Sequence, residues 1–188
     1  TVNLNTGSVD IGGQRASLAM QLAETLNIQY DDIKPQVVDT DSIGYTAVSA
    51  GSRTTFATGL AVIEVGNHLR QQVIERVANF WEVDIEQIDY TKDGNLIGPD
   101  DKKMTFKEMA TMLPNTGGRI QASIDLQATT HVPTIACHIV DVKVDEETGK
   151  VDIVRSTALQ DVGKAIHPSY VEGQTQGGIL QGIGMALY

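Results

Sequence analysis

The sequence predicts an α+β fold with two layers, in which mixed or antiparallel sheets pack against helices. Stretches with helical spacing and stretches with strict alternation both occur, and several alternating stretches follow one another through tight turns. That order is typical of hairpins combined with helices and not of regular strand–helix–strand repeats. The 188 residues, 41% of them hydrophobic, suffice for one sizeable core, so we expect a single domain over residues 1–188.

The first third of the chain predicts a strand, a helix, a second strand and a loop. Residues 1–12 alternate and are bounded by glycines, which predicts a strand or a hairpin. Residues 13–28 have helical spacing, and residues 35–41 form a short strand. A polar, glycine-bearing loop follows over residues 42–55. The apolar face of the predicted helix comprises Leu18, Ala19, Leu22, Ala23 and Leu26.

The middle of the chain predicts the longest helix and a meander. The helix should begin near residues 53–56 and run to about Phe80. Residues 83–105 read as a meander with a hairpin turn at Asp93-Gly94. A short helix over residues 105–113 should be capped by Thr105, with Glu108 completing a capping box.

The last third predicts two strands, Ile139–Val144 and Val151–Val154, joined by a tight turn and followed by a closing helix over residues 171–188. The expected apolar face of that helix comprises Ile179, Leu180, Ile183 and Leu187. Each glycine inside a helix costs about 1 kcal/mol relative to alanine. The helix nevertheless contains Gly173, Gly177, Gly178, Gly182 and Gly184. Spacings of four residues among them would also suit tight helix–helix contact.

Charge and composition exclude several function classes. The net charge of −10 argues against nucleic acid or an anionic membrane as partner, and no apolar run is long enough to span a bilayer. The one cysteine, Cys137, excludes an internal disulfide and fits a cytoplasmic setting. We expect Cys137 to be a buried apolar residue. The chain lacks an initial methionine and ends inside a predicted helix, so we expect a piece of a longer polypeptide.

We expect no metal held by protein side chains. The four histidines lack the spacing of metal ligands, and the acidic loops are typical of solvated surface. No nucleophile–base arrangement with a usable context occurs, and we assign no catalytic residue. The histidines are His68, His131, His138 and His167.

Three segments share one design, in which a Gly/Ser cluster leads directly into a helix: residues 10–17, 49–55 and 167–178. A helix N-terminus exposes free N–H groups, and Arg15 and Arg53 could add forked donors for phosphate. The plainer alternatives are simple turns, a solvated Arg53, and capping of the long helix by Ser52 or Thr54. Together with glutamines at 14, 174, 176 and 181, the segments indicate a large, polar, anionic cofactor.

The same segments resemble the molybdenum-binding subunit of the xanthine dehydrogenase/aldehyde oxidase family of molybdenum hydroxylases. Residues 6–28 are similar to the family pattern G-x-x-[DE]-[IM]-G-x-G, and residues 39–62 to its loop of small residues before a G-x-A-V helix. Residues 144–187 are similar to D-x-G-x-x-x-[NH]-P, then G-Q-x-x-G-[GA], then Q-G-[IL]-G. The match runs from about residue 6 to the C-terminus.

This resemblance implies a fold of the molybdenum-cofactor-binding-domain type. It also implies a molybdopterin cofactor, as the mononucleotide or the cytosine dinucleotide, whose sulfurs hold the molybdenum. Family members hydroxylate a small-molecule substrate, an aldehyde or N-heterocycle, with oxygen from water, and pass electrons to iron–sulfur and FAD subunits or domains. The expected full complex is a cytoplasmic homo-oligomer. The isolated piece should be inactive, because the family's catalytic glutamate lies beyond the closing helix.

The resemblance also assigns cofactor-binding residues. It implies that Gly12, Gly13 and Gln14 lie by the pterin and terminal phosphate, although many members read G-Q-G at this point. It places Gly51 above the molybdenum and Gln174 beside the pterin. It implies that Ser52, Arg53 and Thr54 bind the phosphates. Two other functions stay open on the sequence alone: a non-catalytic domain that carries or inserts the cofactor, and a nucleotide-binding domain that uses its helix N-termini.

Overall fold

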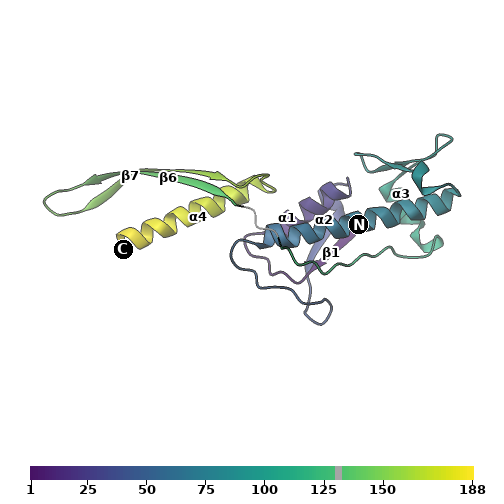
Figure 1. Ribbon diagram of the computed structural model, residues 1–188, viewed down its shortest axis with the longest axis horizontal. Helices are drawn as coiled ribbons and strands as arrows, with labels where there is room; N and C mark the ends of the chain where they lie inside the picture. The colour runs from purple at the N-terminus through teal and green to yellow at the C-terminus, as the bar shows by residue number, and fades with distance from the viewer. Residues whose placement is uncertain (130–132) are drawn as a thin grey trace. The chain divides into compact units, whose positions relative to one another are not determined.

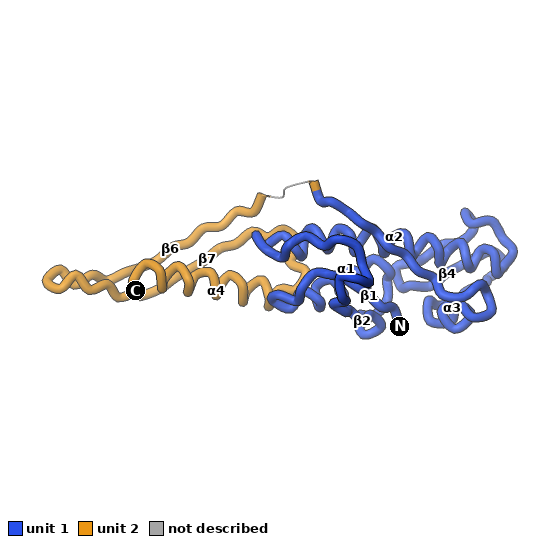
Figure 2. The backbone as a smooth tube through the Cα atoms, turned by 90° about the horizontal axis from the view of Figure 1, so that it is seen from below, with its two compact units in different colours: residues 1–128 blue, residues 129–188 orange. Residues whose placement is uncertain are grey.

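A computed structural model describes residues 1–129 and 133–188 of the chain. Contacts divide the chain into two compact units, residues 1–128 and 129–188, and each is described by itself (Figure 2). A single domain over residues 1–188 therefore stays a prediction. Within the described part of the chain, no helix combines the length and the apolar character needed to cross a membrane.

The first unit begins with a strand–helix–strand crossover (Figure 1). Strand β1 (Val2–Thr6) pairs in parallel with β2 (Ile33–Val37), and α1 (Gln14–Thr25) connects them. Residues 1–12 therefore hold a strand whose partner lies further along the chain, and not a hairpin. The predicted apolar face of α1 is confirmed, because its five residues are all buried in one cluster. That cluster comprises Leu4, Leu18, Ala19, Leu22, Ala23, Leu26, Ile33 and Val62.

The longest helix, α2 (Thr54–Trp81), confirms the predicted position and length. It crosses α1 at two glycines. A Cβ atom on Gly59 would lie 2.8 Å from Gln21 Cδ, and one on Gly66 would lie 2.8 Å from Thr25 Cγ2. The contacts advance along both helices together, so α1 and α2 run in the same direction and their N-termini lie at the same end of the pair.

The second half of unit 1 is an antiparallel meander packed on the end of α2. Its strands are β3 (Asp89–Tyr90), β4 (Asn95–Ile97) and β5 (Lys103–Thr105), followed by α3 (Phe106–Met112). The predicted turn at Asp93-Gly94 and the capping box of Thr105 with Glu108 are both confirmed. Short 3-10 segments lie at Tyr30–Asp32 (η1), Ile85–Gln87 (η2) and Leu113–Asn115 (η3). The core here comprises Val73, Val77, Ala78, Ile88, Tyr90, Leu96, Met104 and Met109.

Tyr90 joins the two cores of unit 1. Its hydroxyl donates to the carbonyl oxygen of Leu26, at the end of α1. Arg70 Nη2 donates to the Tyr90 carbonyl oxygen at 2.9 Å, and the guanidinium lies 4.6 Å from the ring centroid. Burial raises the pKa of Tyr90 to about 12, so the hydroxyl keeps its proton and its hydrogen bond at neutral pH.

The second unit is a long hairpin with one helix. Strand β6 (Ile135–Val144) pairs antiparallel with β7 (Val151–Asp161), and the register shifts between Asp141 and Val142. Helix α4 (Pro168–Leu187) lies along one face of the hairpin. None of the residues described in these three elements is buried. The prediction of a buried Cys137 is therefore wrong for this structure, in which the residue is exposed. The predicted α+β class is confirmed: one pair of strands is parallel and two sheets are antiparallel.

Candidate functional site

The loop before α1 has the backbone conformation that its glycines permit. Gly12 and Gly13 have φ values of 63° and 75°, in the left-handed region that side chains disfavour. Gly13 is the N-cap residue of α1, directly before the helix, and no side chain caps the helix from that position. The two predicted residues therefore form a tight backbone turn at a helix N-terminus, where a ligand can come close to the main chain.

Asp10 already places a negative charge at this helix end. Its carboxylate accepts the Arg15 backbone N–H at 3.0 Å and the Arg15 Nε–H at 2.6 Å. The backbone hydrogen bond from Arg15, followed by the side-chain hydrogen bond, lowers the pKa of Asp10, so the group stays ionised. Arg15 is thus paired with Asp10, and its role as a phosphate donor stays a prediction.

Gln14 points inward. The residue is 5% exposed, and its Nε2 donates to the carbonyl oxygen of Val9, which closes the loop on itself. This amide nitrogen is already committed to the loop. The cofactor role of Gln14 stays a prediction.

The loop before α2 offers a more open helix end. Gly51 and Ser52 both have a left-handed backbone conformation, with φ values of 64° and 55°. Arg53 is the N-cap residue of α2, and its side chain makes no capping hydrogen bond. The alternative that Ser52 or Thr54 caps this helix is therefore wrong. Within the described chain, the exposed side chain of Arg53 makes no hydrogen bond or ion pair, although its carbonyl oxygen accepts the Ala57 N–H at 2.7 Å. The first-turn amides of α2 and one free guanidinium are consequently available to an anion.

The two loops lie together. Ser8 Oγ lies 3.0 Å from Thr58 Oγ1, and Gln21 Nε2 donates to the Thr55 carbonyl oxygen at 3.4 Å. A Cβ on Gly7 would lie 3.1 Å from Thr46 Cβ, so the loop before α2 also packs on the end of β1. These contacts place predicted segments 10–17 and 49–55 at one end of the parallel helix pair.

Apolar side chains are exposed on the same two loops and the first turn of α2. Exposure is 86% for Tyr45 and 73% for Val48. A surface that combines free backbone amides with exposed apolar groups suits a ligand that has both an anionic and a ring-shaped part. The exposed apolar residues are Val9, Ile11, Tyr45, Val48 and Phe56.

Sequence reasoning missed Gln21. The residue is 9% exposed and its Oε1 atom has no hydrogen-bond partner within the described structure. Its packing against Gly59 depends on the absence of a side chain there. Gly59 and Gly66 are seven residues apart and so share one face of a helix, and this spacing is the sequence signal that could have predicted the tight crossing.

The third predicted segment lies in the second unit. At the start of α4, His167 stacks on Tyr170 with 3.6 Å between ring centroids, and Ser169 Oγ lies 3.1 Å from His167 Nδ1. A half-buried stripe, Val171, Thr175, Ile179 and Ile183, lies on one side of α4. Leu180 is 68% exposed, so its predicted place on the packed face is wrong.

The glycines of α4 have open space at their Cβ positions within the described part of unit 2. A Cβ added at each of the five positions would have no neighbour within 4 Å among the described residues. Contact with another helix of unit 2 therefore does not explain them. Helical geometry places Gly173, Gly177, Gln174 and Gln181 on the side opposite the half-buried stripe. Gln174 is exposed there.

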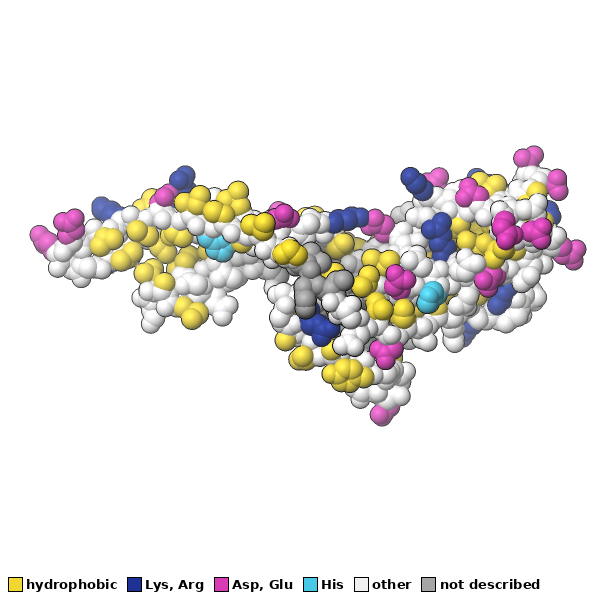
Figure 3. Space-filling model, viewed as in Figure 1, with side chains coloured by type: hydrophobic (Ala, Val, Ile, Leu, Met, Phe, Trp, Pro, Cys, Tyr) yellow, Lys and Arg dark blue, Asp and Glu magenta, His cyan; other side chains and the backbone are white. Residues whose placement is uncertain are grey.

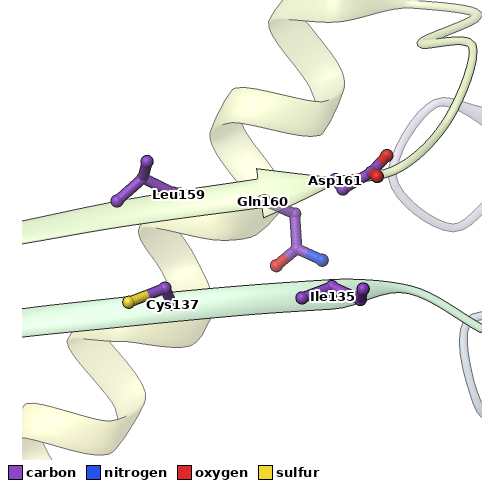
Figure 4. Close-up of a pocket in the computed structure, with 5 residues that line it drawn as sticks. All are labelled: Ile135, Cys137, Leu159, Gln160 and Asp161. Atoms are coloured by element: carbon purple, nitrogen blue, oxygen red, sulfur yellow. The ribbon is translucent and has the colours of Figure 1, made fainter.

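Unit 2 has a depression of its own. It has a volume of about 470 Å³ on the hairpin and is lined by Ile135, Cys137, Leu159, Gln160 and Asp161, with α4 behind the strands (Figure 4). No cluster of three His, Cys, Asp or Glu side chains that could hold a metal ion occurs among residues 1–129 and 133–188. His131 lies outside the described residues.

Comparison with known proteins gives a consistent result. The family model described as "Molybdopterin cofactor-binding domain" matches residues 1–188. The putative xanthine dehydrogenase molybdenum-binding subunit XdhA of Escherichia coli K12 is 28% identical over 196 residues, which are 100% of this chain and 26% of that protein. The nicotine 6-hydroxylase large subunit of Paenarthrobacter nicotinovorans is 28% identical over 202 residues, 98% of this chain and 25% of that protein.

A solved structure shows the same fold. The crystal structure of quinoline 2-oxidoreductase from Pseudomonas putida 86 superposes with a TM-score of 0.84 at 23% identity, covering 97% of this chain and 24% of that one. This chain thus spans about a quarter of the length of the relatives that it matches.

Proposed function

This chain belongs to the molybdopterin cofactor-binding domain family, and from that premise we propose that it binds the cofactor within a larger oxidoreductase. The proposed enzyme is a molybdenum hydroxylase of the xanthine dehydrogenase/aldehyde oxidase type that acts on aldehydes or N-heterocycles. The observation that carries the proposal is the uncapped N-terminus of α2, with free Arg53, beside the glycine turn of α1. The cofactor supplies the molybdenum at which such enzymes hydroxylate carbon with oxygen from water.

The polar groups at the two helix N-termini fit a pterin that carries a nucleotide. The N-terminus of α1 carries a negative side chain, whereas that of α2 carries a positive one. Asp10 occupies the end of α1, where its carboxylate would repel a phosphate. The end of α2 carries uncapped amides, Ser52, Thr54 and a free guanidinium. We therefore propose that the phosphates bind at residues 52–54, and that Gly12 and Gly13 approach the neutral pterin edge.

Two further residues have proposed roles. Gly51 has open space at its Cβ position, so its backbone would leave room beside the molybdenum for a small-molecule substrate. Gln174 lies on the glycine-rich side of α4 and would hydrogen-bond the pterin with its amide. No catalytic base is proposed among residues 1–188.

The assembly is also a proposal. The relatives named above are subunits, which supports further subunits for the intact protein. We propose iron–sulfur and FAD subunits or domains as electron acceptors, and a cytoplasmic homo-oligomer of the full complex.

The test uses the intact protein and measures molybdenum and pterin per subunit. Arg53→Ala should lower cofactor content about 10- to 100-fold if cofactor is limiting, since a charge-assisted hydrogen bond contributes roughly 1.5–3 kcal/mol. Arg119→Ala, at an exposed arginine outside the two loops, is the matched control and should leave the content unchanged. Equal cofactor content in both variants would refute the phosphate placement. Displacement of the cofactor by free nucleotides would favour the nucleotide-binding alternative.

A further inference from the structure

One face of the β6–β7 hairpin is apolar and uncovered. Cys137 pairs directly with Leu159, and Ile135 and Ile139 flank Cys137 two residues away on the same face of the strand. Exposure is 73% for Ile135, 52% for Ile139 and 56% for Leu159. These four residues, here called the open face, include three that line the 470 Å³ depression (Figure 4). Hydrophobic side chains cluster over the hairpin in Figure 3.

Helix α4 accounts for the opposite face only. The half-buried residues of β7, which are Val151, Ile153 and Ala158, pair with Val144, Val142 and His138. Those partners occupy even-numbered positions of β6, whereas the open face uses the odd-numbered ones. The helix therefore covers the even-numbered side only in part, since Val142 and Val144 remain about half exposed there, and it leaves the odd-numbered side to solvent.

A two-stranded sheet in this condition needs a second layer. Hairpins with only two strands are at best marginally stable in water, and a contiguous exposed apolar patch marks a contact surface. Cys137, which was expected to be buried as a small apolar residue, belongs to this same face. The sequence thus places apolar residues on the open face, although no described residue of unit 2 covers that face.

We propose that the open face is an internal packing surface, covered in the intact protein by apolar side chains from a part of the same polypeptide outside residues 1–188. The relatives are about four times as long as the part that this chain matches, so further polypeptide in the intact protein could supply this layer. Charged side chains lie at the two ends of the open face: Asp161, which pairs with Ile135, and the Asp141–Arg155 ion pair at 2.8 Å. Its centre is apolar, which suits permanent packing better than a transient contact.

A single neighbour cannot cover everything that unit 2 leaves exposed. The open face and the glycine-rich side of α4 point in opposite directions from the hairpin–helix layer. The second of these surfaces has its own proposed occupant, the cofactor. The proposal for the open face rests on family membership and polypeptide length, and it would survive a failure of the cofactor-binding assignments.

Cys137 provides a native reporter. In the full-length protein, alkylation of the Cys137 peptide by iodoacetamide is followed by mass spectrometry. The control is the thiol introduced by Thr148→Cys at the exposed turn of the same hairpin. We expect Cys137 to react at least 100-fold more slowly than the control thiol, in cofactor-loaded and in cofactor-depleted protein alike. Equal rates would overturn the proposal.

Crosslinking identifies the covering segment. A benzoylphenylalanine placed at position 139 of the full-length protein is photolysed in a mixture of isotopically light and heavy subunits. We expect crosslinks within one copy to a peptide outside residues 1–188. Crosslinks to residues 1–128, crosslinks between light and heavy copies, or no crosslinked peptide would each overturn the proposal.

Discussion

The side-chain amide of Gln21 packs directly on the backbone of Gly59, so closely that a Cβ atom at residue 59 would lie 2.8 Å from Gln21 Cδ. The amide also donates to the Thr55 carbonyl oxygen, one turn closer to the start of α2. This contact sets the distance between two helices whose N-termini form the proposed site. The crossing therefore connects the packing of unit 1 with the position of its loops.

Gly59→Ala should destabilise the protein by about 1–3 kcal/mol, because the added methyl group overlaps the Gln21 amide and forces the helices apart. The thermal midpoint and the cofactor content of the intact protein should both fall. Gln21→Ala combined with Gly59→Ala should recover part of the lost stability, since it removes the overlapping group. A single substitution without effect would show that the crossing adjusts freely.

Replacing a glycine of α4 by alanine should not destabilise the protein, in contrast to Gly59→Ala. The methyl group of Gly177→Ala meets no neighbour within 4 Å among the described residues, and alanine gains about 1 kcal/mol in helix propensity over glycine. We expect an unchanged or raised thermal midpoint together with a lowered molybdenum content, because the methyl group would occupy space proposed for the cofactor. Glu172→Ala, at an exposed position on the same helix, is the control and should leave the metal content unchanged. Unchanged metal content in Gly177→Ala would contradict the proposed role.

What could be predicted from the sequence was mostly local. The apolar face of α1 and the Thr105–Glu108 capping box depend on residues within a few positions of one another, and both were correct. The parallel pairing of β1 with β2 joins residues about 31 positions apart, and no local pattern specifies that partner. Cys137 was expected to be buried and Leu180 to lie on the apolar face of the closing helix, and both are exposed. A pattern shows that a face is apolar, but burial also requires a neighbouring layer.

The candidate site was predictable to a similar extent. Glycine positions such as Gly12 and Gly51 were identifiable because left-handed turns need them. The Asp10–Arg15 pair and the inward orientation of Gln14 were not, because they depend on how the loop folds back on itself.

Tyr90 should make stability sensitive to alkaline pH. Burial raises its folded-state pKa to about 12, above the value near 10 of an exposed tyrosine. The stabilising contribution is therefore complete below pH 10 and is lost as the pH rises from 10 through 12. Urea unfolding across this range should show a fall in the free energy of unfolding that is smaller in Tyr90→Phe. Tyr45→Phe, at an 86% exposed position, should behave like the unmodified protein.

Asp10 should make the free energy of unfolding sensitive to acidic pH. Its hydrogen bonds with Arg15 lower its pKa, so its contribution is present above the usual carboxyl pKa near 3.9 and is lost as the pH falls through the folded-state value. Asp10→Asn should cost about 1 kcal/mol at pH 7, where the charge favours the N-terminus of α1. The difference from the unmodified protein should vanish in acid. Asp125→Asn, at an exposed position, should cost nothing at either pH.

Gly51 should separate catalysis from cofactor binding in the intact enzyme. Its φ of 64° is unfavourable for a side chain by about 1–3 kcal/mol, whereas its Cβ position is open within the described chain. Any loss beyond this strain must come from what lies over the residue. We expect Gly51→Val to keep near-normal molybdenum per subunit and to lose most of its turnover per molybdenum, because the branched side chain occupies space proposed for substrate. Gly44→Val is the matched control, since it has the same open surroundings without a left-handed backbone, and it should retain turnover. If Gly51→Val empties the site while Arg53→Ala leaves it filled, the proposed position of this loop over the cofactor is wrong.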